Sequence, residues 1–187
     1  VPHFPYAEVA IVGRSNVGKS SLLNRVVGRR SLARVSRTPG RTQQINFFLI
    51  DERIVLADLP GYGFARVPRP VQQQWKTLVE GYLASRDMLR AVMVLIDIRR
   101  GVQADDTVLL TYLHQQHIPA QVVVTKADKL AYGARQRQAR EIAAQLPNHF
   151  AAPLICSAQS GDGVREVWQA VQEYLRSTTP DESPVPE

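Results

Sequence analysis

Residues 13–20, GRSNVGKS, have the spacing of a phosphate-binding loop: two glycines five apart, then a lysine and a hydroxyl residue. They follow an apolar run at 8–12 and precede a helical pattern at 20–27, which is the context this motif needs. Glycines let the backbone wrap around phosphate oxygens, and N–H groups at a helix N-terminus supply partial positive charge. Lys19 would add a full charge at the β- and γ-phosphates, and Ser20 would offer a hydroxyl to Mg²⁺. The pattern predicts a nucleoside triphosphate site, with a chance glycine turn as the alternative.

A second motif, Asp58-Leu59-Pro60-Gly61, follows an apolar run at 53–57. A carboxylate at a strand end can hold Mg²⁺ through water, and the Gly61 amide can reach a γ-phosphate. Alone this pattern is typical of a turn. It supports a nucleotide site here because it follows the phosphate-binding loop in the sequence.

A third motif, Thr125-Lys126-Ala127-Asp128, follows an apolar run at 121–124 and bears on the choice of base. The Asp128 carboxylate can accept hydrogen bonds from guanine N1–H and N2–H₂, and adenine offers no such pair of donors. Polar sites of this kind reject the wrong ligand by on the order of 10⁴-fold. The stem of Lys126 would pack along the base. This motif favours GTP and argues against an ATP-dependent nucleotide kinase.

A fourth, shorter motif is Cys156-Ser157-Ala158, after the apolar run at 153–156. Its backbone N–H groups could meet guanine O6, and a plain strand-end turn is the alternative. Cys156 is the only cysteine, so no internal disulfide or thiolate zinc site can form, and this fits a reducing cytoplasm. We expect Cys156 to be a buried apolar residue and not a reactive thiol.

The segment 28–44 has no clear periodicity, and such long irregular stretches are commonly functional. Thr38 and Thr42 are the two candidates for a switch threonine that closes over Mg²⁺ and the γ-phosphate. We favour Thr42, which lies just before the apolar run at 45–50, whereas Thr38 begins a Thr-Pro-Gly turn.

Apolar runs alternate with helical patterns along the chain, which predicts an α/β fold of three layers with a mostly parallel six-stranded sheet. The runs at 45–50 and 53–57 are joined so tightly that they must form an antiparallel hairpin, which adds one antiparallel edge strand. Ligands of such folds bind at the carboxyl ends of the strands. We predict a single domain at 1–176 and a disordered tail at 177–187.

The net charge is +6, with 19 arginines and 4 lysines, and no acidic residue lies between Lys19 and Asp51. This basic stretch is either a solvated face or a surface for polyanions, which the planar arginine fork suits. The chain has no apolar run long enough to span a membrane and no signal-peptide pattern, so we expect no membrane partner.

Three stretches together resemble the EngB (YihA/YsxC) family within the TrmE-Era-EngA-EngB-septin-like P-loop GTPases. They are GRSNVGKSSLLN at 13–24, RTPGRTQQINFF at 37–48 and DLPGYGFARV at 58–67. The resemblance covers residues 8–176. It implies a Ras-like G domain that hydrolyses GTP as a molecular switch, assists assembly of the large (50S) ribosomal subunit and is needed for cell division.

The resemblance also assigns roles residue by residue. Phosphate contacts would come from Gly13, Arg14, Ser15, Asn16, Val17, Gly18, Lys19 and Ser20. The switch contacts would come from Gly40, Arg41, Thr42, Gln43 and Gln44 and from Asp58, Leu59, Pro60 and Gly61. Guanine contacts would come from Thr125, Lys126, Ala127, Asp128, Cys156, Ser157 and Ala158. Lys19, Thr42 and Gly61 would act in catalysis, and Ser20 and Thr42 would hold Mg²⁺.

The implied partners are GTP or GDP and the large ribosomal subunit or its RNA, with no DNA, and the implied state is a cytoplasmic monomer. RNA contacts would come from arginines in or beside the switch loops: Arg29, Arg30, Arg34, Arg37, Arg66 and Arg69. The alternative is a GTPase that binds a protein partner in cell division without touching the ribosome.

Tyr62 occupies the position where many GTPases carry the glutamine that orients the attacking water. We therefore expect slow intrinsic hydrolysis that a partner or a cation accelerates. Similar GTPases with asparagine at the position of Asn16 can bind K⁺ beside the phosphates. The alternative is that Asn16 only shapes the loop.

Overall fold

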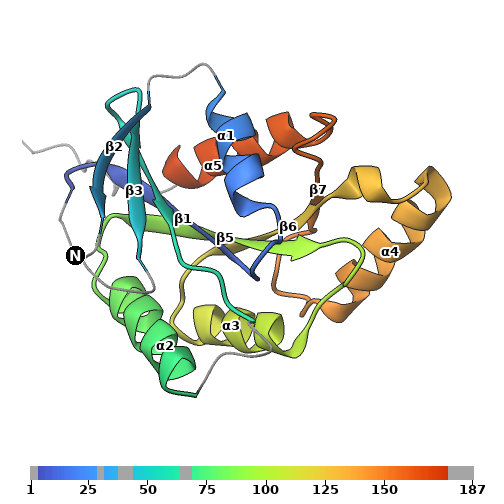
Figure 1. The fold of residues 1–187 in the computed structure, drawn as a ribbon, viewed down its shortest axis with the longest axis horizontal. Helices are drawn as coiled ribbons and strands as arrows, with labels where there is room; N and C mark the ends of the chain where they lie inside the picture. The colour runs from blue at the N-terminus through green and yellow to red at the C-terminus, as the bar shows by residue number, and fades with distance from the viewer. Residues whose placement is uncertain (1–3, 29–31, 38–43, 64–68, 177–187) are drawn as a thin grey trace, which may run out of the picture.

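The structure of the protein, a computed structural model, describes residues 4–28, 32–37, 44–63 and 69–176. Within these residues seven strands form one sheet, in the order β2-β3-β4-β1-β5-β6-β7 (Figure 1). The strands are β1 (Ala7–Gly13), β2 (Leu32–Arg37), β3 (Asn46–Ile50), β4 (Ile54–Asp58), β5 (Leu89–Asp97), β6 (Ala120–Thr125) and β7 (Leu154–Ile155). The helices are α1 (Lys19–Val27), α2 (Arg69–Ala84), α3 (Ala104–Gln115), α4 (Tyr132–Gln145) and α5 (Val164–Arg176), with a short 3₁₀ turn η1 (Ala127–Lys129).

The predicted fold class is confirmed: β1 and β3 to β7 form a six-stranded part of the sheet in which five strands are parallel and one, β3, is antiparallel. The prediction that the segment 28–44 holds no regular structure was wrong. Its residues Leu32–Arg37 form β2, which pairs antiparallel with β3, so β3 is not the edge of the sheet. The sequence LARVSR has no apolar alternation, and an edge strand depends on backbone pairing along one side only.

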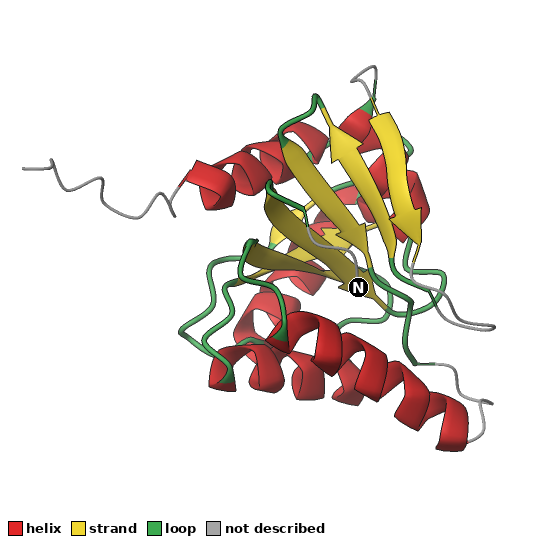
Figure 2. Ribbon diagram, turned by 90° about the vertical axis from the view of Figure 1, so that its left-hand side faces the viewer, coloured by secondary structure: helices red, strands yellow, loops and turns green. Residues whose placement is uncertain are grey.

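Helices cover both faces of the sheet, as Figure 2 shows from the side. α1 and α5 pack on one face, against Val9 and Ile11 of β1. α2, α3 and α4 pack on the other, against Ala10 and Val12. Successive side chains of a strand point to opposite faces, so a central strand in this setting is apolar at most positions. No helix in the part of the chain that the structure describes is long and apolar enough to cross a bilayer.

A buried charged cluster lies at the start of β1. Glu8 is fully buried and accepts hydrogen bonds from Tyr82 Oη and from the Arg86 guanidinium, whose Nε lies 3.2 Å from Glu8 Oε1. The guanidinium also lies over the Phe47 ring, 5.3 Å from its centroid. The cluster joins β1 to α2 at the end of the sheet away from the motifs.

We expect Arg86→Met to lower the free energy of unfolding by about 3–5 kcal/mol, because it leaves the Glu8 charge buried without its partner. Chemical denaturation measures this loss. The matched control is Arg165→Met, since the Arg165 side chain is 82% exposed and, among the residues that the structure describes, its one ion pair is with its neighbour Glu166. Equal stability of the two variants would contradict this account of the cluster.

Parallel strands bring the four sequence motifs to one edge of the sheet. The strands before the four motifs are β1, β4, β6 and β7, which end at Gly13, Asp58, Thr125 and Ile155. They lie in the order β4-β1-β5-β6-β7 in the sheet, with β5 between β1 and β6. Since carboxyl ends of parallel strands share an edge, the loops that follow them converge there.

Candidate nucleotide-binding site

The phosphate-binding loop joins β1 to α1 and wraps around an open cavity. Gly18, at the N-terminus of α1, has φ of 101°. Residues with a Cβ atom rarely adopt this conformation, whereas glycine does so without strain. Thr125 Oγ1 donates to the backbone oxygen of Val17 over 2.7 Å, so the loop is fixed to the end of β6. This arrangement points the start of α1, whose first N–H groups have no partner within the helix, at the cavity.

The cavity has a volume of about 580 Å³, and its walls come almost wholly from the phosphate-binding loop. Its lining residues are Arg14, Ser15, Asn16, Val17, Gly18, Lys19, Ser20, Ser21, Gly61 and Lys126. The Lys19 ammonium pairs with the Asp58 carboxylate, and both side chains are 15% exposed. A positive group and backbone donors around such a volume suit a polyphosphate.

The oxygen donors at this cavity fit Mg²⁺. Ser20 lines the cavity and its hydroxyl makes no hydrogen bond to the described residues, while the Asp58 carboxylate lies beside Lys19 at the end of β4. Mg²⁺ takes hard oxygen ligands, and in nucleotide sites it uses one or two protein groups together with phosphates and water.

The Asp58–Gly61 loop is held against the phosphate-binding loop by a bridge between Arg14 and Tyr62. Ser15 N donates to Tyr62 O over 2.9 Å, and Tyr62 N donates to Gly13 O over 3.3 Å. Trp75 Nε1 donates to Pro60 O over 2.8 Å and fixes the same loop to α2. The backbone of Gly61 is thereby placed at the wall of the cavity.

The Tyr62 side chain points away from the cavity. It is 6% exposed, and its hydroxyl donates to Asp106 Oδ1 of α3 over 2.6 Å. Burial, together with the Asp106 carboxylate, raises the pKa of Tyr62 well above its ordinary value. Burial also raises the pKa of Asp106, although the Tyr62 hydrogen bond opposes this effect. A phenol fixed in this way cannot orient a water molecule in the cavity.

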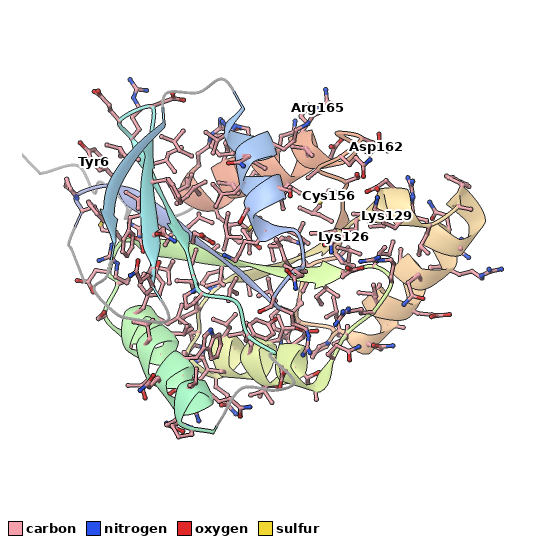
Figure 3. All side chains as sticks on the ribbon, in the orientation of Figure 1. Tyr6, Lys126, Lys129, Cys156, Asp162 and Arg165 are labelled. Atoms are coloured by element: carbon pink, nitrogen blue, oxygen red, sulfur yellow. The ribbon has the colours of Figure 1, made fainter. Side chains whose placement is uncertain are left out.

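The third and fourth motifs meet at Asp128. Ser157, which is fully buried, donates from Oγ to Asp128 Oδ1 over 2.6 Å. This hydrogen bond, with the nearby Lys129 ammonium, lowers the pKa of Asp128. The loops are also joined by their backbones, because Ala127 N donates to Cys156 O over 3.1 Å. Figure 3 shows Lys126, Lys129 and Cys156 in this region.

Cys156 has the properties expected of a structural thiol. It is 1% exposed, and burial raises its pKa to about 12. The thiolate, which is the reactive form, is therefore scarce at neutral pH.

The loop after β7 depends on Gly163. This residue has φ of 70°, and a Cβ added to it would lie 1.9 Å from the backbone oxygen of Ile155. We expect Gly163→Ala to lower the free energy of unfolding by about 2–4 kcal/mol, since it adds both backbone strain and overpacking. Thermal denaturation tests this. A change under about 0.5 kcal/mol would contradict it, and Gly133→Ala is the control, because an added Cβ there meets nothing within 4 Å.

The structure brings together most of the residues that the sequence singled out. The carboxyl edge of the sheet holds all four motifs: residues 13–20, Asp58 to Gly61, Thr125 to Asp128 and Cys156 to Ala158. Gln44 precedes β3, whose first residue, Asn46, pairs with Asp58 at this edge. The expected positions of Gly40, Arg41, Thr42 and Gln43 lie outside the described residues.

Sequence reasoning missed Asp97, the last residue of β5, which pairs with Lys126. The sequence feature that could have identified Asp97 is its position as a carboxylate at the carboxyl end of a mostly apolar strand. Trp75, which belongs to none of the four motifs, also acts at the site, because its indole N–H donates to Pro60 O of the second motif.

Comparisons with known proteins agree with this geometry. A family model described as 50S ribosome-binding GTPase matches residues 8–126. A probable GTP-binding protein EngB from Syntrophomonas wolfei is 48% identical over 170 residues, which cover 90% of this chain and 86% of that protein. The corresponding protein from Geobacter sulfurreducens is 45% identical over 179 residues, covering 92% and 85%.

The fold also matches a crystal structure of a probable GTP-binding protein EngB with a TM-score of 0.66. The match covers 92% of this chain and 100% of that one at 22% identity, so it bears on the fold alone.

Proposed function

This chain belongs to the EngB family of GTP-binding proteins and is a P-loop GTPase, and on that premise we propose that it is a switch in the assembly of the large ribosomal subunit. The observation that carries the proposal is the match of residues 8–126 to a family described as 50S ribosome-binding GTPases. The net charge of +6 supports an RNA target, because phosphate contacts dominate such binding. We place its action in the cytoplasm, which suits a chain with one buried cysteine.

In this proposal the described site binds GTP with Mg²⁺. The phosphates lie in the cavity beside Lys19 and the N–H groups of residues 18–20, and the base lies between Lys126 and Asp128. Ser20 would hold Mg²⁺ directly and Asp58 through water, and Thr42, outside the described residues, would complete the ligands. When bound, Mg²⁺ supplies positive charge to the phosphate oxygens.

The chain's own groups then stabilise the charge that develops as water attacks the γ-phosphate. Lys19 and the backbone N–H groups of the phosphate-binding loop are fixed before the reaction, and such preorganised donors stabilise a transition state strongly. The Gly61 N–H would reach the γ-phosphate. Because the Tyr62 hydroxyl is held by Asp106, the residue directly after Gly61 does not orient the attacking water, and we expect slow intrinsic hydrolysis.

Two roles for Asn16 remain in the proposal. Its φ of 63° supports the role of shaping the loop. Its side chain is exposed at the cavity and makes no hydrogen bond within the described residues, which leaves it able to bind K⁺. Faster hydrolysis in K⁺ than in Na⁺ buffer would support the second role, and equal rates would leave only the first.

The test is co-sedimentation with purified large ribosomal subunits, with the protein loaded with a non-hydrolysable GTP analogue or with GDP. We expect binding with the analogue, at least about tenfold weaker binding with GDP, and a steep loss with added salt. Lys19→Met, which should not hold the analogue, is the negative control. No sedimentation in either state would overturn the ribosomal role and favour the alternative, a protein partner in cell division held at high salt.

A further inference from the structure

Asp97 lies between the phosphate-binding loop and the guanine-site loop. It is the last residue of β5, and it pairs in register with Thr125 at the end of β6. On the other side of β5, Leu95 pairs with Gly13 of β1. The Asp97 side chain is only 5% exposed. A carboxylate thus lies buried at the carboxyl edge of the sheet, in a position that none of the four sequence motifs includes.

The Asp97 carboxylate is held by two cations. Lys126 Nζ lies 3.1 Å from Oδ2. Arg99 makes a two-pronged contact, with Nε 3.0 Å from Oδ1 and Nη2 2.7 Å from Oδ2, and its backbone N–H donates to Oδ1 over 3.0 Å. Burial alone would raise the pKa of Asp97, but these hydrogen bonds lower it to about 2. The carboxylate is therefore ionised at neutral pH.

The pairing fixes the course of the Lys126 side chain. Lys126 has φ of 60°, and its ammonium also donates to the backbone oxygen of Asn16. Its stem lies along the phosphate-binding loop, with Cε 3.5 Å from the point that a Cβ on Gly18 would occupy. Asp97 is the one carboxylate within ion-pair distance of Lys126 in the described part of the chain.

We propose that Asp97 is a positioning residue of the guanine-nucleotide site, which holds Lys126 extended across the phosphate-binding loop so that the base meets a preformed surface. The inference rests on the proposed placement of the base between Lys126 and Asp128. Without Asp97, the flexible lysine stem would have to be ordered by the nucleotide, and its lost rotamer freedom would weaken binding. Arg99 satisfies the remaining carboxylate lone pairs and keeps Asp97 charged.

A purely structural role makes a different prediction. The turn after β5 is closed by backbone bonds, from Arg100 N and Gly101 N to the Asp97 carbonyl oxygen, and these do not need the carboxylate. If the carboxylate served only to stabilise this turn, its loss would change stability and leave the dependence of binding on Lys126 unaltered.

The experiment is a double-mutant cycle on the full chain, with fluorescently labelled GDP as the probe. Asp97→Asn should raise Kd roughly tenfold to hundredfold. In a Lys126→Met background the same change should alter Kd by less than about threefold, because the group through which Asp97 acts is gone. The ratio of GDP to IDP affinity should stay at its wild-type value, since the guanine 2-amino group is read by Asp128.

The matched control is Asp87→Asn, an exposed aspartate just before the other end of β5, which should leave Kd unchanged. Should Asp97→Asn not fold, as thermal denaturation would reveal, Asp97→Glu keeps the charge but moves the carboxylate, and it should give an intermediate Kd with the same dependence on Lys126. Wild-type affinity in both Asp97 variants, or additive effects in the cycle, would overturn the proposal. Unchanged affinity in Lys126→Met would overturn the proposed placement of the base itself.

Discussion

Asp128→Asn is expected to move the base preference of the site from guanine to xanthine nucleotides by roughly 10³-fold or more. In the proposed site the Asp128 carboxylate would accept hydrogen bonds from both N1–H and N2–H₂ of guanine. A carboxamide accepts from N1–H but presents its own N–H₂ to the second position, which matches the O2 acceptor of xanthine and leaves the guanine amino group without a partner. Ser157 Oγ, 2.6 Å from Asp128 Oδ1, can donate equally to an amide oxygen, so the side chain should stay in place.

Competition of GTP and XTP for the labelled nucleotide measures this exchange. Asp162→Asn is the control, because the Asp162 side chain is 63% exposed and its carbonyl, which receives the Ser157 N–H, is unaltered. We expect the control to keep the guanine preference. If Asp128→Asn also kept it, the base could not lie against Asp128.

Lys19→Met is expected to lower kcat/KM for GTP on the order of 10³-fold, by removal of one preorganised positive donor from the cavity. The methionine keeps most of the side-chain volume, so the fold should survive. Asp58 would lose its ion pair and keep Asn46 Nδ2, 3.5 Å from its other oxygen. The loss should appear in both GTP binding and single-turnover hydrolysis, because in the proposed site the ammonium would contact phosphate oxygens in the ground state and in the transition state.

Lys76→Met provides the comparison for this variant. Lys76 lies on α2, is 58% exposed and pairs only weakly with Glu80, at 3.7 Å. Its replacement should leave GTP turnover within about twofold of the wild type, as is usual for surface positions. A Lys19→Met protein with activity within tenfold of the wild type would mean that the phosphates do not lie in the cavity beside Lys19.

The parts of the fold that could be predicted are those whose sequence pattern has one physical solution. β1, β5 and β6 are buried on both faces, and their sequences are therefore mostly apolar with few polar interruptions. β2 could not be predicted, because it forms by pairing with β3 and not through an apolar pattern of its own. The local sequence of a strand does not show which distant segment will pair with it.

In the site, too, features that depend on local sequence could be predicted, and contacts between distant segments could not. Each motif is a short local pattern after a strand, and a parallel sheet brings such positions together without further information. The contacts of Tyr62 with Asp106, of Trp75 with Pro60 and of Asp97 with Lys126 join residues between 15 and 44 positions apart, and no periodicity marks them. They form only when the strands have paired and the helices have packed on the sheet.

The ion pair between Lys19 and Asp58 has a consequence for thermodynamic linkage. Without ligands each charge neutralises the other. A phosphate that binds Lys19 alone leaves the negative charge of Asp58 without a partner. A cation that binds Asp58 alone leaves the positive charge of Lys19 without a partner. Two ligands arriving together replace one ion pair with two, so anion and cation should bind with positive cooperativity. Because such coupling is reciprocal, the concentration of either ligand sets the apparent affinity for the other.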